Sequence, residues 1–417
     1  MSKIAGLLFL VLFFAHSERE AVAQSRASKS PLLSIGVADS LYSNVLQEQR
    51  QFWIHLPGGA PLVEGRRYPV IYLLDAEVHL GGLAAVQAYY NEFRMPEMIV
   101  VGISNANHRT RDLTPTEITS RNGAQVEESG GSDRFTSFLA DELMPFIDSK
   151  YPTTNHSVLI GHSYAGLFAV NTLVNNPELF TNYIALDPSL GWDDQQWLAG
   201  ALGKIDSMDL SGKGLYVSVA NEIIRFSNSM TIETVVADTT DFSLGIRSTL
   251  SFVKHLEKKG PPGLRFDWKF SEKDIHGSIP LIGMRDAMVY LYDFWELKNP
   301  SLYNDPNTPT EQLISMIRAQ SESRSANMGY PLPMEEDLLE MLAFMSLEMM
   351  DQPGKARAVL LQSAEYYPES LNIQTSLVEV CLALEDYSCA EEHARVADKL
   401  EDGTRNTEKV LDAQKSR

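Results

Sequence analysis

Seven short apolar runs, separated by longer amphipathic stretches, limit the fold of residues 50–297 more than any other feature. Several runs are apolar at almost every position, as strands covered on both faces must be. The runs are RQFWIHL (50–56), PVIYLLD (69–75), MIVVGIS (98–104), HSVLIGHS (156–163), NYIALD (182–187), GLYVSVAN (214–221) and RFDWKFS (265–271). Because helical patterns alternate with these runs, the sequence predicts an α/β domain with a mostly parallel central sheet.

The pattern changes after a segment rich in Pro and Asn, KNPSLYNDPNTPT (298–310). Beyond it only helical periodicity remains. Two stretches resemble each other when Ala356 is aligned with Ala390, a spacing of 34 residues that is typical of tetratricopeptide helix pairs. Generic helical hairpins are the alternative. The expected organisation is an α/β domain over 24–300, a linker with a helix over 301–334, and a small all-α tetratricopeptide-like domain over 335–417.

Residues 1–23 have the features of a signal peptide. Lys3 precedes the apolar stretch 4–15, and Ala21-Val22-Ala23 supplies small residues for cleavage before Gln24. Twelve apolar residues are too few to cross a bilayer, although an uncleaved anchor is the alternative reading. We therefore expect an exported protein, periplasmic or secreted, without a membrane span.

The net charge and the cysteine content limit which macromolecules and metal ions the protein is expected to bind. A formal net charge of −20 opposes binding to nucleic acid or to an anionic membrane. Cys381 and Cys389 are the two cysteines, and without clustered histidines they do not form a structural zinc site. They form either a disulfide or a buried reduced pair. Neither a metal nor a cofactor is expected.

The run VLIGHSYAGLFAV (158–170) contains Gly-x-Ser-x-Gly between an apolar strand and an apolar helix. Strand, turn and helix together are the requirement for a nucleophile elbow, in which flanking glycines avoid collisions and the turn exposes the serine hydroxyl. Ser163 is therefore the predicted nucleophile, with a purely structural turn as the alternative. The helix that follows directs its free amides at the site, so the backbone N–H of Tyr164 is an expected oxyanion donor.

The base and the acid should follow the serine along the chain. His276 lies in the loop after the last predicted strand, so it is the expected base. Glu222 follows the strand 214–221 and is the preferred acid. Asp187, which ends the strand 182–187, is the second choice, and a Ser–His dyad without an acid stays open. The second oxyanion donor is expected in the loop after the early strand, at the N–H of Asp75, Ala76 or Glu77, with Ala76 preferred.

Five stretches of the chain resemble the esterase family of α/β hydrolases, which includes enterochelin and other siderophore esterases, feruloyl esterases and S-formylglutathione hydrolase. They are VIYLLDAEVH (70–79), VGISNANHRTRDLTPT (101–116), LIGHSYAGLFAV (159–170), VSVANE (217–222) and DIHGSIPL (274–281). The resemblance implies an α/β-hydrolase fold and metal-free hydrolysis of carboxylic esters. It places Ser163 and His276 at the nucleophile and base positions and Glu222 at the acid position. Ala76 departs from the usual Leu-Asp-Gly.

Three further residues are candidates for binding a small-molecule ester. Arg109 and Arg111 lie after a strand, where a guanidinium can hold an anionic substrate, or an Arg–Asp112 pair can order the loop. Trp192 follows the strand 182–187, and it either lines an acyl pocket or is simply packed. The predicted activity is that of a serine esterase. A catalytically silent scaffold that binds a partner, or itself, through its C-terminal helices and an acyltransferase are the alternatives.

Overall fold

The computed structural model describes residues 34–59, 61–91, 94–121 and 123–415, and the chain from Val37 onward forms one compact unit. The predicted signal peptide lies outside the described residues. Within the described ranges, no helix combines the length and the apolar character needed to cross a bilayer.

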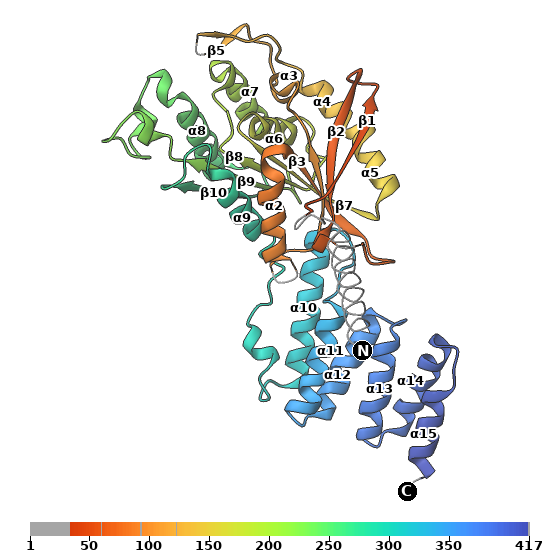
Figure 1. Cartoon of the computed structure of the whole chain (residues 1–417). Helices are drawn as coiled ribbons and strands as arrows, with labels where there is room; N and C mark the ends of the chain where they lie inside the picture. Colours follow the sequence, from red (N-terminus) through yellow and green to blue (C-terminus); the bar gives the residue numbers. More distant parts are fainter. Residues whose placement is uncertain (1–33, 60, 92–93, 122, 416–417) are drawn as a thin grey trace, which may run out of the picture. The chain divides into compact units, whose positions relative to one another are not determined.

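An eight-stranded sheet in the order β1-β2-β4-β3-β7-β8-β9-β10 forms the α/β part (Figure 1). Its strands are β1 (Val37–Ser43), β2 (Glu48–His55), β3 (Tyr68–Leu74), β4 (Ile99–Ile103), β7 (Thr153–His162), β8 (Asn182–Leu186), β9 (Gly214–Ala220) and β10 (Arg265–Ser271). β2 pairs antiparallel with β1 and β4, and the other pairs are parallel. The predicted α/β class is thus confirmed.

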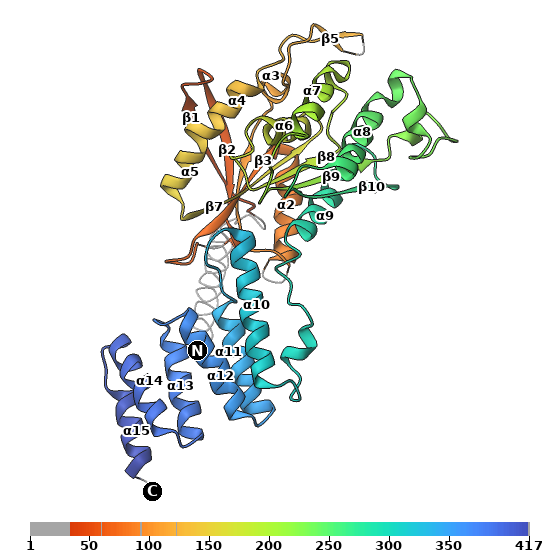
Figure 2. The same cartoon turned by 180° about the vertical axis from the view of Figure 1, so that it is seen from behind.

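Helices cover both faces of this sheet (Figures 1 and 2). One face packs on α2 (Ala76–Tyr90) and α9 (Ile279–Leu291), and the other on the remaining helices. These are α3 (Arg109–Leu113), α4 (Ser132–Phe138), a π-helical turn (Leu139–Leu143), α5 (Met144–Lys150), α6 (Tyr164–Asn175), α7 (Gln196–Ile205) and α8 (Leu244–Lys259). A small hairpin, β5 (Ser120–Arg121) and β6 (Ala124–Gln125), follows α3.

The strand β3 shows why its sequence is apolar throughout. Val70, Tyr72 and Leu74 belong to one core, whereas Ile71 and Leu73 belong to the core on the opposite face. Since successive side chains alternate between faces, both faces must be apolar when both are covered. All seven predicted strands are present. The edge strand β1 was not predicted because polar residues interrupt the apolar ones in its sequence VADSLYS, and most of the strand is exposed.

The C-terminal region is entirely helical. It contains α10 (Thr310–Met328), α11 (Glu336–Phe344), α12 (Pro353–Tyr366), α13 (Leu371–Ala383), α14 (Tyr387–Leu400) and α15 (Arg405–Lys415). From α11 onward each helix packs on the next. Ala356 and Ala390 are both fully buried, in α12 and α14 respectively, as the proposed repeat requires. The tetratricopeptide-like classification itself stays a prediction.

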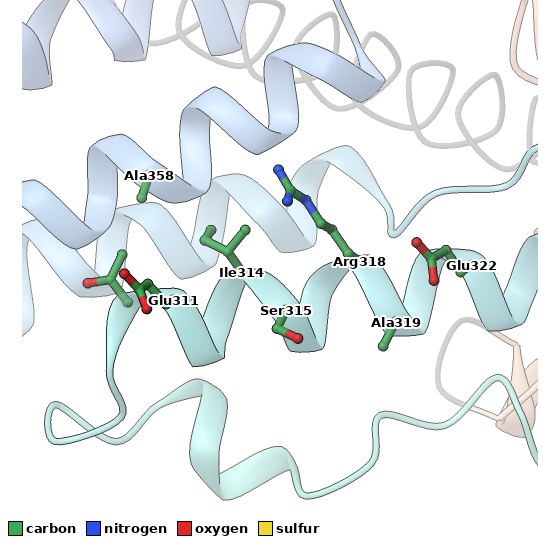
Figure 3. A pocket seen from close by; sticks show the side chains of 8 residues that line it. Glu311, Ile314, Ser315, Arg318, Ala319, Glu322 and Ala358 are labelled. Atoms are coloured by element: carbon green, nitrogen blue, oxygen red, sulfur yellow. The ribbon is translucent and has the colours of Figure 1, made fainter.

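A surface hollow and a disulfide belong to this helical region. A surface hollow of about 520 Å³ runs along α10 and contains Glu311, Arg318 and Glu322 (Figure 3). Cys381 and Cys389 form a disulfide, with their Cα atoms 5.8 Å apart. The sequence left this choice open because spacing alone does not fix which side chains meet.

Residues from α10 contribute to the core of the α/β part. Met328 packs in the same core as α2 and α9. Gln320 donates hydrogen bonds to the carbonyl oxygens of Phe294 and Trp295, at 2.9 and 3.1 Å. The guanidinium of Arg324 lies 4.3 Å from the Trp295 ring centre and donates to the Trp295 carbonyl and to Glu335. A chain ending at residue 300 would lose all these contacts.

Replacing Arg324 by Met should lower the free energy of unfolding by about 2–4 kcal/mol, because Met keeps the packing on Trp295 but removes charged donors from a buried position. Arg318→Met, on the same helix, is the matched control. Its side chain is more than half exposed, lies 3.8 Å from Glu365 and donates one hydrogen bond to Gln362, so we expect a smaller loss of about 1 kcal/mol. Urea denaturation measures both, and equal losses would contradict a structural role for Arg324.

Candidate active site

Ser163 occupies a strained turn between β7 and α6. Its φ and ψ are 61° and −117°, a region that non-glycine residues seldom adopt. A Cβ on Gly161 would lie 2.1 Å from the carbonyl oxygen of Ala165, and one on Gly166 would lie 3.0 Å from Pro188. Glycine is therefore required on the strand side and strongly favoured on the helix side. This is the geometry of a nucleophile elbow.

An imidazole and a carboxylate meet near this turn. The Nδ1 atom of His276 lies 2.5 Å from Oδ2 of Asp187. The other oxygen of Asp187 accepts the backbone N–H of Ala220 at 2.9 Å, which fixes the carboxylate. Asp187 directly follows β8 and Ser163 directly follows β7, and these neighbouring strands are parallel. The sheet therefore brings both residues to the same edge.

The side chain of Glu222 makes a different contact from the one predicted. Its Oε1 accepts the backbone N–H of His276 at 2.7 Å, and its Oε2 lies 2.8 Å from Arg225. The carboxylate that contacts the imidazole is that of Asp187, the second choice of the sequence analysis. The preference for Glu222 as the imidazole partner is therefore corrected: its strand end is close to the histidine loop, but its side chain binds the main chain.

The hydroxyl of Ser163 lies 3.2 Å from the hydroxyl of Ser189, in the loop after β8. The His276 ring packs on the ring of His162, the residue before the serine, with ring centres 4.4 Å apart. The predicted base and nucleophile therefore lie on adjoining segments. In unliganded enzymes the nucleophile–base hydrogen bond is often long and tightens when substrate binds.

The expected oxyanion donors lie at the first positions of two helices. Tyr164 begins α6 and Ala76 begins α2, and the first amides of a helix have no acceptor within it. Asp75, which precedes Ala76, has a left-handed conformation with φ 51°. Arg109 donates to both carboxylate oxygens of Asp75 at 2.8–3.0 Å and to the carbonyl of His162 at 3.3 Å. It therefore links the Ala76 turn to the elbow.

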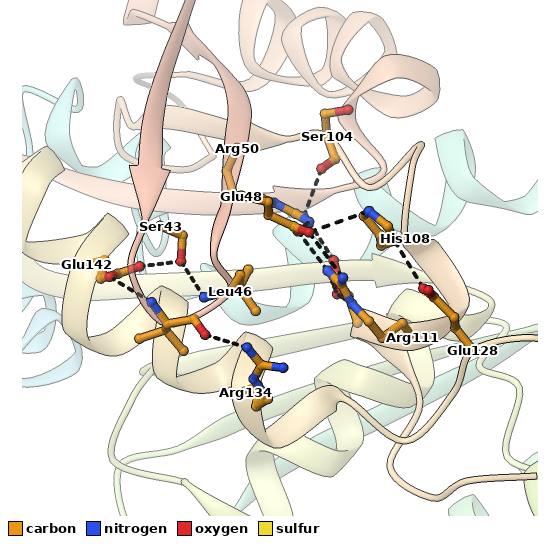
Figure 4. Close-up of polar contacts among 12 residues, drawn as sticks. Ser43, Leu46, Glu48, Arg50, Ser104, His108, Arg111, Glu128, Arg134 and Glu142 are labelled. Atoms are coloured by element: carbon orange, nitrogen blue, oxygen red, sulfur yellow. Dashed lines mark hydrogen bonds and ion pairs between the residues drawn. The ribbon is translucent and has the colours of Figure 1, made fainter.

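Arg111 belongs to a network of ion pairs around Glu48 (Figure 4). It lies 2.7 Å from both Glu48 and Asp112, and Arg50 pairs with the same two carboxylates. Burial tends to raise the pKa of Glu48, but hydrogen bonds from Arg111 and Arg50 outweigh it and lower this pKa to about 2. The alternative reading of Arg111, a pair that orders the loop, is the one this geometry supports.

Trp192 is fully buried, and its Nε1 donates to Thr116 at 3.0 Å. The guanidinium of Arg121 lies 5.0 Å from the ring centre of Tyr164 and 5.2 Å from that of Trp192. Within the described residues, Nη1 of Arg121 is buried and lacks a hydrogen-bond partner. Arg121 could not be predicted from the sequence, because nothing in the hairpin sequence shows that its side chain reaches the residue after the nucleophile.

The fold and the elbow define the class: an α/β hydrolase with a serine at the carboxyl edge of a mostly parallel sheet. Residues 43–209 match the family described as "Putative esterase". Over these residues the chain is similar to this esterase family, and siderophore esterases are among its relatives.

Ferri-bacillibactin esterase BesA of Bacillus subtilis is 33% identical over 144 residues, which cover 30% of this chain and 49% of that protein. The siderophore enterobactin esterase of Emericella nidulans is 36% identical over 104 residues, covering 24% and 32% respectively. The chain thus spans half or less of the length of these curated relatives.

A crystal structure of an IroE-like serine hydrolase from Shewanella oneidensis matches 79% of this chain and 99% of its own, with 27% identity and a TM-score of 0.65. Residues 1–297 are 297 of the 417 residues, or 71%, which is less than the 79% that matches. The match therefore extends into the helical region.

Proposed function

We propose that the protein is an exported serine esterase that cleaves carboxylic esters through an acyl-enzyme intermediate. The observation that carries the proposal is the Asp187–His276 pair at the sheet edge where the strained Ser163 turn also lies. A carboxylate on Nδ1 holds the imidazole in the tautomer whose other nitrogen can accept a proton.

In this mechanism the hydroxyl of Ser163 attacks the ester carbonyl while His276 takes its proton. The N–H groups of Tyr164 and Ala76 stabilise the resulting oxyanion. Collapse of the tetrahedral intermediate expels the alcohol, which receives the proton from His276. Water, activated by the same imidazole, then releases the acid and restores the serine.

The substrate is proposed to be a siderophore-type or aryl ester. The relatives, a ferri-bacillibactin esterase and a siderophore enterobactin esterase, support the first class. A guanidinium without a carboxylate partner in the described ion pairs, Arg121, stacks on the residue that follows the nucleophile and would favour an anionic ester. Arg109 is neutralised by Asp75, so its contribution to substrate binding is weaker than the sequence suggested. The ring of Trp192 packs against the ring of Tyr164, with centres 5.4 Å apart, and would hold Tyr164 in place.

Export is supported by the features of residues 1–23 and by the disulfide between Cys381 and Cys389, because disulfides persist in oxidising compartments. The helical region is proposed to bind a protein partner or a second copy of the chain. The hollow along α10 is one surface available for this.

The decisive experiment is an ester-hydrolysis assay with protein of residues 24–417. Its substrates are esters of one aryl alcohol, some with a neutral acyl group and some with an acyl group that carries a carboxylate. We expect hydrolysis of both, with kcat/KM higher for the anionic ester and this preference lost in Arg121→Gln. No hydrolysis of any ester would favour the scaffold. Transfer to added alcohols in preference to water, detected by product analysis, would favour the acyltransferase.

A further inference from the structure

Three imidazoles from three separate segments lie together at the site. The rings of His162 and His276 are 4.4 Å apart between centres and tilted by 39°, and the rings of His79 and His162 are 5.3 Å apart and nearly perpendicular. His79 comes from the first turns of α2, His162 from the end of β7, and His276 from the loop after β10. The proposed mechanism uses only His276.

The ring of His162 contacts the main chain of the base. The ring of His162 has a hydrogen bond with the backbone of His276. This bond favours the protonated form of His162, as a bond from a ring N–H to a carbonyl oxygen does. The N–H of His276 is held by Glu222. The main chain of His276 is thus bound from two sides, and its ring is held by Asp187 through Nδ1 and by the face of His162.

His162 is held as a neutral ring. Burial is the largest cause, and the nearby charges of His276, His79 and Arg109 act in the same direction, so the pKa of His162 falls to about 3. Its Nε2 is buried and has no hydrogen-bond partner in the described part of the chain. An unpartnered acceptor on a neutral ring costs less than an unpartnered N–H on a cation. Two carboxylates pair with the charged groups around His162: Asp187 pairs with His276, and Asp75 pairs with Arg109.

We propose that His162 is a positioning residue: its neutral imidazole, supported edge-on by His79, holds the His276 ring and main chain in place for proton transfer with Ser163. This inference rests on the proposed serine-esterase function. A positively charged ring at this position would oppose the imidazolium that His276 becomes when it takes the serine proton. Errors of about 1 Å in such placement can cost about 100-fold in rate.

Three substitutions separate the two contacts. His162→Phe keeps a ring against His276 but removes the hydrogen bond, and His162→Asn keeps a donor near the Nδ1 position but removes the ring. His162→Ala removes both. We expect kcat to fall about 10-fold for Phe and for Asn and about 100-fold for Ala, with KM within about threefold of wild type. His255→Phe, at a surface histidine paired with Asp206, is the matched control and should leave kcat unchanged.

Full kcat in all three variants, with an unchanged pH profile, would overturn the proposal. A uniform loss of thermal stability without the split between kcat and KM would assign His162 a merely structural role. Wild-type protein gives an independent test that needs no variant. In NMR spectra with backbone-linked histidine assignments, the His162 ring should stay neutral from pH 8 to pH 5, and titration of His162 within that range would refute the neutral platform.

The proposed serine-esterase function is tested by different results from those that test the role of His162. It is lost if wild type hydrolyses no ester, or if Ser163→Ala hydrolyses esters as well as wild type does. The inference about His162 is lost only through the comparison of its own variants with an active wild type.

Discussion

Ser163→Ala should reduce kcat for aryl-ester hydrolysis by about 10⁵- to 10⁶-fold, because the hydroxyl that forms the covalent intermediate is gone and only the oxyanion donors and substrate binding remain. Alanine has no bulkier side chain than serine, so the strained turn at φ 61° should persist. Initial rates under saturating substrate measure the effect.

Ser189→Ala is the control for this substitution. It removes the hydroxyl that lies 3.2 Å from that of Ser163 but leaves the nucleophile and the imidazole pair intact. We expect its kcat within about tenfold of wild type. Similar losses in the two variants would mean that the Ser163–Ser189 contact, rather than nucleophilic attack, explains the effect.

Asp187→Asn should be the second-largest loss, about 10³- to 10⁴-fold in kcat. An amide can donate to Nδ1 of His276 and so favours the tautomer that presents a proton, rather than a free electron pair, toward the serine. The loss should appear in kcat more than in KM, since the contact lies behind the ring that meets the substrate.

Glu222→Gln is the matched control, because the glutamine carbonyl can still accept the His276 N–H that Glu222 accepts at 2.7 Å. The pair with Arg225, whose side chain is mostly exposed, contributes little. We expect a loss below about tenfold. If Glu222→Gln loses as much activity as Asp187→Asn, then the acid is shared between the two residues or belongs to Glu222.

The elbow could be predicted because its requirements are local. A strand, a turn and a helix follow one another within VLIGHSYAGLFAV, and the reason for Gly161, an oxygen 2.1 Å from any Cβ, arises four residues away at Ala165. The position of His276 could be predicted because it lies in the loop after the last strand. In both cases chain order contains the information.

The acid could not be chosen from the sequence because two carboxylates, Asp187 and Glu222, follow adjacent parallel strands. Topology takes both to the same sheet edge, and only side-chain direction decides which one meets the imidazole. Arg111 and Arg121 show the same limit. The first lies near a carboxylate contributed by β2, and the second reaches Tyr164 from a hairpin, so neither environment is visible in the neighbouring residues.

Covalent labelling tests the central claim most directly. Purified protein treated with a fluorophosphonate should gain the mass of one adduct, peptide mapping should place that adduct on Ser163, and labelling should be lost in Ser163→Ala and slowed in Asp187→Asn. Equal labelling of wild type and Ser163→Ala, or an adduct on another residue, would contradict the account.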